Sequence, residues 1–356
     1  MQEQRKKILV GMSGGVDSSV TAALLVREGY EVIGGYMRNW SDGKEENGVC
    51  TWKTDRRDAQ RVAAHLGIPL MTFDFEAQYR AEVVQYLYDE YAAGRTPNPD
   101  VLCNRQIKFG YFLDAAKRLG CDAVATGHYA GVHVADTVAH LLRAKDDNKD
   151  QTYFLHQLNQ EQLRHALFPL QPYLKSEVRD LAREFDLPTA ERKESMGICF
   201  VGRVPIKDFL QSNVAATPGD VVLEDGTRIG THDGLQFFTI GQRHGFTQPG
   251  GGEPYYVAAK NLTTGQLIVA PRESELLLSN SVEVSKMHWI SSTSPAQSLR
   301  CLARLRHRAP LASCTVDPHE DGSATVVFDE PQWGAAPGQF CVLYTEQECL
   351  GGGPIR

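Results

Sequence analysis

The sequence lacks the features of a membrane or secreted protein. The chain of 356 residues has no run of about eighteen apolar residues, so no transmembrane helix is expected. Its start, MQEQRKKILVGM, passes from charged residues directly into a short apolar run. It lacks the long apolar region and small-residue cleavage site of a signal peptide. These absences predict a cytoplasmic protein without a membrane partner.

The chain also lacks cysteine pairs at metal-binding spacing and lacks an excess of positive charge. Its eight cysteines include no CxxC pair, which argues against a zinc ribbon and a thioredoxin-like site, and we predict no metal-ligating residues. In a reducing compartment they are not expected to form a disulfide framework. The net charge of −7 is not typical of a nucleic-acid binder, so any RNA binding needs local basic patches.

The first part of the chain alternates short apolar runs with amphipathic segments. Strands are predicted at 6–12, 31–37, 68–75 and 121–130, and helices at 18–30, 55–67, 81–94, 107–120 and 176–188. This alternation is typical of βαβ units around a parallel sheet. We therefore predict an α/β domain over residues 1–203.

The remaining sequence is rich in turns and short alternating runs. Thr, Gly, Asp and Pro interrupt it every few residues from 217 onward, which predicts a small β-rich domain at 204–273. Five further runs predict a second all-β unit, a small barrel at 274–356. They lie at 282–290, 299–307, 314–318, 323–330 and 338–345. A chain of this length is expected to form two or three domains.

The segment GMSGGVDSSV, residues 11–20, joins the first predicted strand to the first helix. Free N–H groups and the helix dipole form an anion site there, and glycines allow close approach of the backbone. The segment has neither the lysine of the GxxxxGK[ST] phosphate loop nor the GxGxxG pattern. Asp17 suits a phosphate site only if it holds Mg²⁺ or caps the helix. The alternative is an ordinary strand-to-helix turn with Ser and Asp caps.

Cys103 and Cys199 lie in polar segments marked by proline or glycine, TPNPDVLCNRQIKFG and ESMGICFVG. The thiolate is the reactive form of cysteine, and nearby cations such as Arg105 and Lys108 favour it. We expect both thiols to be exposed. The alternative for any cysteine is a small buried apolar residue. We predict that role for Cys121, Cys301, Cys314 and Cys341.

The stretch SGGVDSS resembles the pyrophosphate loop of ATP pyrophosphatases, which cleave ATP between the α- and β-phosphates. Six further stretches extend the resemblance over nearly the whole chain to the tRNA-specific 2-thiouridylases. They are TPNPDVLCNRQIKF, ATGHYA, KDQTYFL, SMGICFVG, TIGQRHG and APGQF. The resemblance implies an adenine-nucleotide α-hydrolase-like N-terminal domain followed by β-rich domains.

This resemblance also implies an activity. Such enzymes use ATP, expected with Mg²⁺, to replace the 2-oxygen of the wobble uridine by sulfur in tRNAs for Lys, Glu and Gln. The sulfur is expected from an upstream carrier protein or a cysteine desulfurase relay. The resemblance leaves two routes of sulfur transfer open. Either a persulfide attacks the base directly, or sulfide is released near the base.

Residue roles follow from the same resemblance. Residues that match the ATP-binding positions are Gly11, Met12, Ser13, Gly14, Gly15, Val16, Asp17, Ser18, Met37 and Gly127. Asn98, Pro99 and Asp100 match the segment that receives the target base. Cys103 matches the nucleophile and Cys199 the persulfide carrier. Asp100 is the candidate general acid or base, and its alternative role is a helix cap.

The positions implied to contact tRNA are His128, Lys149, Asp150, Gln151, Arg306, His307 and Gln339. His307 departs from the family pattern, in which a tyrosine is expected. On a strand, Arg304, Arg306 and Arg308 would all point the same way, which predicts a basic face. The alternative is an ordinary solvated charge run. Gly127 and His128 follow a predicted strand, where open α/β sheets place their ligands.

Three other functions stay open at this point. An amide-forming synthetase of the same superfamily would share the loop but need no cysteine pair. An RNA-binding module would carry a degenerate ATP site, which the intact SGGVDS argues against. A redox dithiol protein would use Cys103 and Cys199 but leave the loop unexplained.

Overall fold

Five parallel strands form the sheet of the N-terminal domain. Their order is β3 (Leu70–Asp74), β2 (Glu31–Arg38), β1 (Lys7–Gly11), β4 (Ala123–Ala125) and β7 (Ala166–Leu167). Ile8 and Val10 pack on one face against α1 (Val16–Arg27), α2 (Thr51–Leu66) and α9 (Lys175–Glu184), whereas Leu9 belongs to the core on the other face. Apolar residues are needed on both faces because helices cover both. The predicted α/β fold is confirmed.

The computed structural model describes residues 5–41, 51–193, 206–211, 213–247 and 253–356. Cys199, the predicted persulfide carrier, lies outside these ranges, as do Cys50 and the glycine tract 250–252. No helix in the described part of the chain is long and apolar enough to cross a bilayer.

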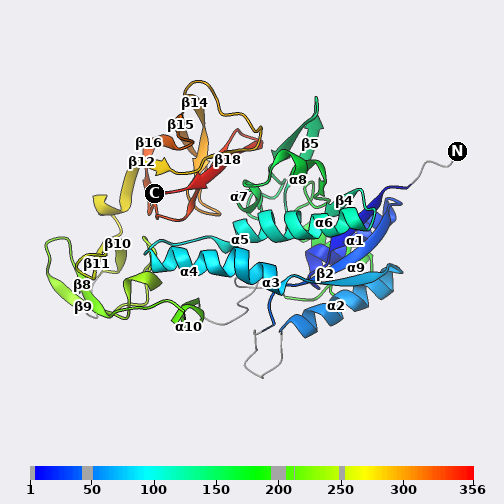
Figure 1. Cartoon of the computed structure of the whole chain (residues 1–356), viewed down its shortest axis with the longest axis horizontal. Helices are drawn as coiled ribbons and strands as arrows, with labels where there is room; N and C mark the ends of the chain where they lie inside the picture. Colours follow the sequence, from blue (N-terminus) through cyan, green and yellow to red (C-terminus); the bar gives the residue numbers. More distant parts are fainter. Residues whose placement is uncertain (1–4, 42–50, 194–205, 212, 248–252) are drawn as a thin grey trace.

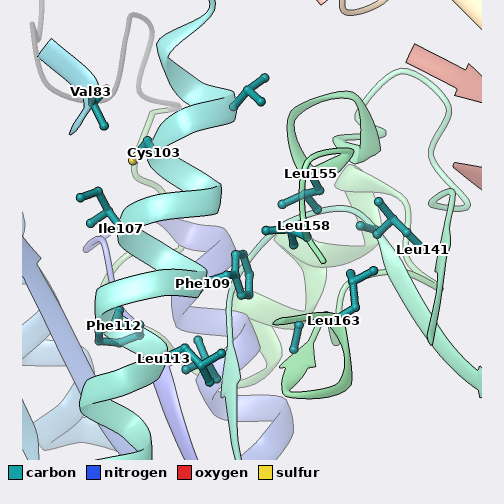
Figure 2. Close-up of a cluster of buried hydrophobic side chains, with 14 of the residues drawn as sticks. Val83, Cys103, Ile107, Phe109, Phe112, Leu113, Leu141, Leu155, Leu158 and Leu163 are labelled. Atoms are coloured by element: carbon teal, nitrogen blue, oxygen red, sulfur yellow. The ribbon is translucent and has the colours of Figure 1, made fainter. Parts of the chain in front are cut away.

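A chain of short helices covers the second face of this sheet. It consists of α3 (Glu76–Tyr79), η1 (Arg80–Val84), α4 (Gln85–Ala92), α5 (Pro99–Leu102), η2 (Cys103–Tyr111) and α6 (Phe112–Arg118). The segments η1 and η2 are π-helical, a conformation that is rare and often found at functional sites. Cys103 and Ile107 face Val83, whereas Phe109 points toward Leu158 (Figure 2). The wide turns of η2 thus begin at the predicted nucleophile.

A four-stranded sheet follows α10 (Ile206–Gln211). Its order is β10 (Tyr255–Asn261), β11 (Gln266–Pro271), β8 (Gly219–Val222) and β9 (Arg228–His232). A short turn of helix, η3 (Leu235–Phe237), packs into its small core. Figure 1 shows α4 extending from the N-terminal domain toward this sheet. Lys260 of β10 donates to the Gly94 carbonyl just after α4, at 2.9 Å.

The C-terminal strands form a barrel-like sheet. The order is β12 (Leu278–Val284), β16 (Ala324–Trp333), β15 (Ala312–Pro318), β14 (Leu299–Arg304), β17 (Phe340–Tyr344), β18 (Glu348–Pro354), β6 (Val138–Leu142) and β5 (Gly131–Ala135). The short strand β13 (His288–Trp289) pairs with β18, and η4 (Glu275–Leu277) precedes β12. Cys301, Cys314 and Cys341 are buried in its core, and Cys121 is buried in the N-terminal domain. The predicted apolar role of these four cysteines is confirmed.

Strand β18 was not predicted because glycines fill it. A Cβ at Gly352 would overlap the Cys341 carbonyl, and one at Gly353 would lie 2.6 Å from the Ser285 carbonyl oxygen. Gly351 has φ 133°, which side chains rarely adopt. The strand therefore requires residues with low intrinsic strand propensity.

The hairpin β5–β6 joins the N-terminal domain to the barrel. Its strands pair along 131–135 and 138–142, and β6 pairs with β18 at Leu142 and Leu141. The turn residues Asp136 and Thr137 both have positive φ, 47° and 72°. This hairpin was not predicted, because Asp-Thr is not one of the glycine-containing pairs that favour such turns. The helices α7 (Thr152–Leu155) and α8 (Gln160–Arg164) follow it.

A buried carboxylate lies where the hairpin, α7 and the barrel meet. The Asp150 side chain is fully buried, and the hydroxyl of Thr152 donates to it at 2.8 Å. Arg304 of β14 and Arg143 reach it from two sides, at 3.7 and 4.0 Å. Burial raises the pKa of the Asp150 carboxyl, although these partners act in the opposite direction. The Asp150 oxygens face the protein interior in this structure, and its expected contact with tRNA stays a prediction.

We predict that Asp150→Ala lowers the free energy of unfolding by about 3–5 kcal/mol, because Arg304 is left buried without its carboxylate. Urea denaturation followed by circular dichroism measures the change. Asp147→Ala is the matched control, since Asp147 pairs with the same Arg143 but its side chain is 76% exposed. That control should cost less than about 1 kcal/mol. Equal urea midpoints for the two variants would contradict the buried role of Asp150.

Candidate active site

The glycine loop lies between β1 and α1, in close contact with two neighbouring segments. Gly14 has φ 77°, and a Cβ there would overlap the Asp55 carbonyl of α2. A Cβ at Gly127 would lie 2.8 Å from the backbone nitrogen of Ser18. Glycine is therefore required at both positions, one by conformation and both by space. The end of β4 and the start of α2 thus fix the shape of the loop.

Serine hydroxyls hold the loop internally and leave the start of α1 uncapped. Ser18 donates its hydroxyl to the Gly15 carbonyl at 3.1 Å, and Ser19 does so at 2.7 Å. The Ser13 N–H donates to Ser18 Oγ at 3.2 Å. The N-cap residue of α1 is Gly15, and no side chain caps the helix. The alternative of a turn capped by Ser or Asp is wrong, and the helix N-terminus keeps its capacity to bind an anion.

Asp17 pairs with a lysine from a distant helix. Lys175 of α9 donates to both carboxylate oxygens, at 2.6 and 2.8 Å. The Tyr129 hydroxyl donates to the same carboxylate at 3.0 Å. Neither Lys175 nor Tyr129 was identified as a site residue. The ion pair joins residues 158 positions apart, so no local pattern could have revealed it.

Arg192 holds the outer side of the loop. Its guanidinium donates to the Gly14 carbonyl at 2.7 Å, to Asp58 at 2.8 Å and to Asp55. These bonds join α2 and the segment after α9 to the loop backbone. Sequence reasoning missed Arg192 as well, because it belongs to none of the motifs.

A cavity of about 290 Å³ opens beside the loop. Its lining combines the loop, the segment before α7, α9 and the barrel: Ser13, Gly15, Val16, Asp17, Tyr129, Lys149, Gln151, Lys175, Lys193, His307 and Arg308. Four of these side chains are cationic and one is a carboxylate. With the uncapped helix N-terminus, this excess of positive charge suits a phosphate-bearing ligand. The donor set therefore fits the phosphates of ATP.

His307 is an aromatic, neutral part of this cavity. Its ring lies 4.5 Å from that of Phe154, measured between centroids. Burial, together with Arg308, Arg304 and Lys149, lowers its pKa to about 4. The imidazole is therefore uncharged near pH 7. It can pack or hydrogen-bond here as the expected tyrosine would.

The predicted basic face at Arg304, Arg306 and Arg308 is wrong. Strand β14 ends at Arg304, which is buried beside Asp150, and a turn follows. Arg306 is half-buried and donates to the carbonyls of Gly334, at 2.7 Å, and Ile240. Arg308, with φ 67°, is exposed and lines the cavity. Alternation fails because the strand stops before the run of arginines does.

Cys103 is buried, contrary to the expectation of an exposed thiol. It is 1% exposed and belongs to the core between η1 and η2 (Figure 2). Burial raises the pKa of its thiol to about 11, outweighing Lys108 and a hydrogen bond from Tyr79, which lower it. At neutral pH the thiol is protonated. The cation identified in the sequence is thus present but is overcome by desolvation.

The segment 98–100 leads directly into Cys103. Asn98 is the N-cap of α5, Pro99 is its first residue and is buried, and Asp100 lies half-buried in its first turn. Asn98 therefore occupies the N-cap position, and the alternative role of Asp100 as a helix cap is wrong. Asp100 acts on the pKa of Cys103 by raising it, as a nearby negative charge does.

Gln339 of the barrel holds the chain just before this segment. Its side-chain amide donates to the carbonyl of Thr96 at 3.0 Å and to that of Pro97 at 3.3 Å. The Thr96 N–H donates to the Pro337 carbonyl at 2.8 Å. Gln339 was expected to contact tRNA; in this structure it positions the backbone that leads to Asp100.

His128 links the glycine loop to the Cys103 helix. It follows Gly127, and its Nδ1 lies 2.7 Å from the Thr126 hydroxyl. Its Nε2 lies 3.4 Å from Nζ of Lys108 in η2. Burial and Lys108 lower the pKa of His128 well below its usual value, so the ring is neutral. Its expected contact with tRNA stays a prediction.

The remaining predicted residues divide between the cavity and the core. Lys149 and Gln151 line the cavity, and the Gln151 side chain accepts from the Tyr129 N–H at 3.0 Å. Met12 is 2% exposed and packs under β2. Gly11 lies beside Met37, whose Cε would be 3.3 Å from a Cβ at that glycine. No group of three or more metal-ligating side chains occurs within the described ranges.

Comparison with known proteins covers nearly all of the chain. Residues 6–203 match a family model described as a tRNA methyl transferase HUP domain. Residues 207–271 match a tRNA methyl transferase PRC-barrel domain, and residues 279–355 an aminomethyltransferase beta-barrel domain. These three matches agree with the parallel sheet, the small sheet and the barrel seen here.

Curated relatives match over nearly their whole length. The chain is 48% identical to tRNA-specific 2-thiouridylase MnmA 2 of Geobacillus kaustophilus, over 98% of this chain and 94% of the relative. It is 47% identical to tRNA-specific 2-thiouridylase MnmA of Lacticaseibacillus paracasei, again over 98% and 94%. With nearly half of its residues shared from end to end, the chain belongs to the tRNA-specific 2-thiouridylase family.

Proposed function

We propose that this member of the family binds the phosphates of ATP in the cavity beside the glycine loop. As a tRNA-specific 2-thiouridylase, the chain is an enzyme that thiolates the wobble uridine of tRNA in an ATP-dependent reaction. One observation carries the placement of ATP: the cavity combines an uncapped helix N-terminus with four cationic side chains. A synthetase, a binding module without catalysis and a redox dithiol are no longer needed as explanations.

The loop residues would hold the leaving group. ATP supplies an adenylyl group, which makes the uracil 2-oxygen a better leaving group, and pyrophosphate departs. Ser13, Gly15 and the N-terminus of α1 offer preorganised donors for its negative charge. Gly11, Met37 and Gly127 would lie nearer the adenosine. Asp17 is the carboxylate that would hold Mg²⁺, since Mg²⁺ prefers carboxylate and phosphate oxygens.

The segment 98–100 would receive the target base. A uridine in an anticodon loop must leave its stack to reach a protein pocket. Asp100 is placed one helical turn before Cys103 and would act as the general acid or base. Lys149, Gln151, His307 and His128 would contribute to the tRNA side of the site. The substrates would be the tRNAs for Lys, Glu and Gln.

Sulfur would arrive as a persulfide on Cys199, loaded by a carrier protein or a cysteine desulfurase relay. In one route its terminal sulfur bonds to C2 of the base as the C2–oxygen bond to AMP breaks. Cys103 then attacks Cys199 Sγ, which releases the thiouridine and leaves a Cys103–Cys199 disulfide. In the other, Cys103 attacks the persulfide first and frees sulfide, which attacks C2. In both routes the outer sulfur of the persulfide is reduced by two electrons, and Cys103 and Cys199 end as a disulfide.

Cys103 must become accessible for either route. Two cysteines bond only when their sulfur atoms approach to about 2 Å. The described state buries Cys103 almost completely and keeps it protonated. We therefore propose that substrate binding opens the contact between η1 and η2 before sulfur transfer.

We predict that Cys199→Ser and Cys103→Ser each abolish 2-thiouridine while tRNA-dependent pyrophosphate release continues, because activation precedes sulfur transfer. Mass spectrometry of tRNA nucleosides and a pyrophosphate assay measure the two steps. Cys121→Ala, a change of a buried cysteine outside the site, should keep both. Normal thiouridine levels with Cys199→Ser would show that the persulfide role is wrong.

The buried state of Cys103 gives a second prediction. At pH 8, iodoacetamide should modify Cys103 of the free enzyme more than about a hundredfold more slowly than N-acetylcysteine, because a pKa near 11 leaves little thiolate. Peptide mass spectrometry follows the modification. Addition of tRNA with ATP should increase the rate. Fast alkylation of the free enzyme would contradict the burial described here.

A further inference from the structure

The glycine loop has no lysine, yet a lysine lies beside it. Phosphate loops of the GxxxxGK[ST] type carry the lysine within the loop. Here Lys175, the first residue of α9, brings its ammonium group to Asp17 in the first turn of α1. Its side chain is only 14% exposed. The tertiary fold therefore supplies a cation at the position where this loop has none in sequence.

Several contacts fix the position of Lys175. Its backbone N–H donates to Asp146 at 2.9 Å, and its ammonium lies 5.7 Å from the centre of the Tyr129 ring. Tyr129 and Lys175 both bind the Asp17 carboxylate, and all three line the cavity. The start of α9 is further held by Glu177, which accepts from the Leu174 N–H at 2.6 Å. A group this well held loses little entropy when a ligand arrives.

Arg308 provides a second cation to the lining of the cavity. It belongs to the barrel, whereas Lys175 belongs to the N-terminal domain. It follows His307, whose ring packs against Phe154 of α7. That contact places the turn 305–308 over the cavity, and Arg308 is one of its lining residues. The ligand-binding surface is therefore built from two domains.

We infer that Lys175 and Arg308 together bind the pyrophosphate end of ATP and stabilise the charge that it gains on departure. The inference rests on the proposed placement of ATP and names the residues that replace the missing loop lysine. Lysine has three donors, so Lys175 can keep its bond to Asp17 while it donates to a phosphate oxygen. The guanidinium of Arg308 can bind two phosphate oxygens at once. Adenosine monophosphate lacks the groups that these cations bind.

The test compares ligands that do and do not carry the pyrophosphate. Isothermal titration of the full chain without tRNA measures the Kd of pyrophosphate, ATP and AMP. Lys175→Met and Arg308→Gln should each weaken pyrophosphate and ATP binding about tenfold or more, as expected for loss of a charge-assisted hydrogen bond. AMP binding should not change. Arg183→Gln is the matched control, because Arg183 lies in the same helix but pairs with Asp180 and Glu191.

Unchanged pyrophosphate affinity in either variant, or an equal loss of AMP affinity, would overturn the role of that residue. If Arg308→Gln weakened tRNA binding alone, Arg308 would belong to the tRNA surface instead. Lys175→Met leaves Asp17 without its cation, so Asp17→Asn with Lys175→Met serves as a second variant. Titrated without Mg²⁺, which Asp17 would hold, it should show the same loss. Pyrophosphate release by the wild type tests the proposed function separately. Pyrophosphate release by the wild type, together with unchanged pyrophosphate affinity in the variants, would refute only the inference.

Discussion

The buried Asp150 carboxylate is the interaction on which the arrangement of the site depends. It lies between Arg143 at the end of the β5–β6 hairpin and Arg304 at the end of β14. Two arginines and a hydroxyl compensate a charge that the interior would otherwise exclude. Because one arginine comes from each domain, the carboxylate fixes the barrel against the N-terminal domain. The turn with His307 and Arg308 follows Arg304 directly, so its place over the cavity depends on this contact.

The site is thus an interface between domains. The barrel contributes two side chains to the cavity, and Gln339 holds the backbone that leads to Asp100. The N-terminal domain contributes the glycine loop and Lys175. His128 connects the glycine loop with the helix that begins at Cys103. It follows Gly127, which packs on the loop, and it lies beside Lys108 of that helix. A change in the barrel can therefore affect both the nucleotide and the base.

Burial favours the neutral form of each titrating group in this region. That form is deprotonated for histidine and protonated for cysteine. Burial keeps His128 and His307 neutral, which removes positive charge near the Lys-rich cavity. It also keeps Cys103 protonated and protected. A thiol that is inert until the base arrives avoids side reactions, and the π-helical turns that begin at Cys103 supply a segment able to rearrange.

The class of fold, the glycine loop and the family could be predicted from the order of residues alone. Alternating apolar and amphipathic segments have a local cause, the covering of a parallel sheet, so they could be predicted. The hairpin β5–β6 and the glycine strand β18 could not, because their positive φ values and close backbone contacts are imposed by partners far along the chain. The burial of Asp150 and Arg304, the protonated state of Cys103 and the contact of Lys175 with Asp17 became evident only in the folded chain. Burial and ion pairing between distant segments are properties of the assembled core, and no local spacing of residues encodes them.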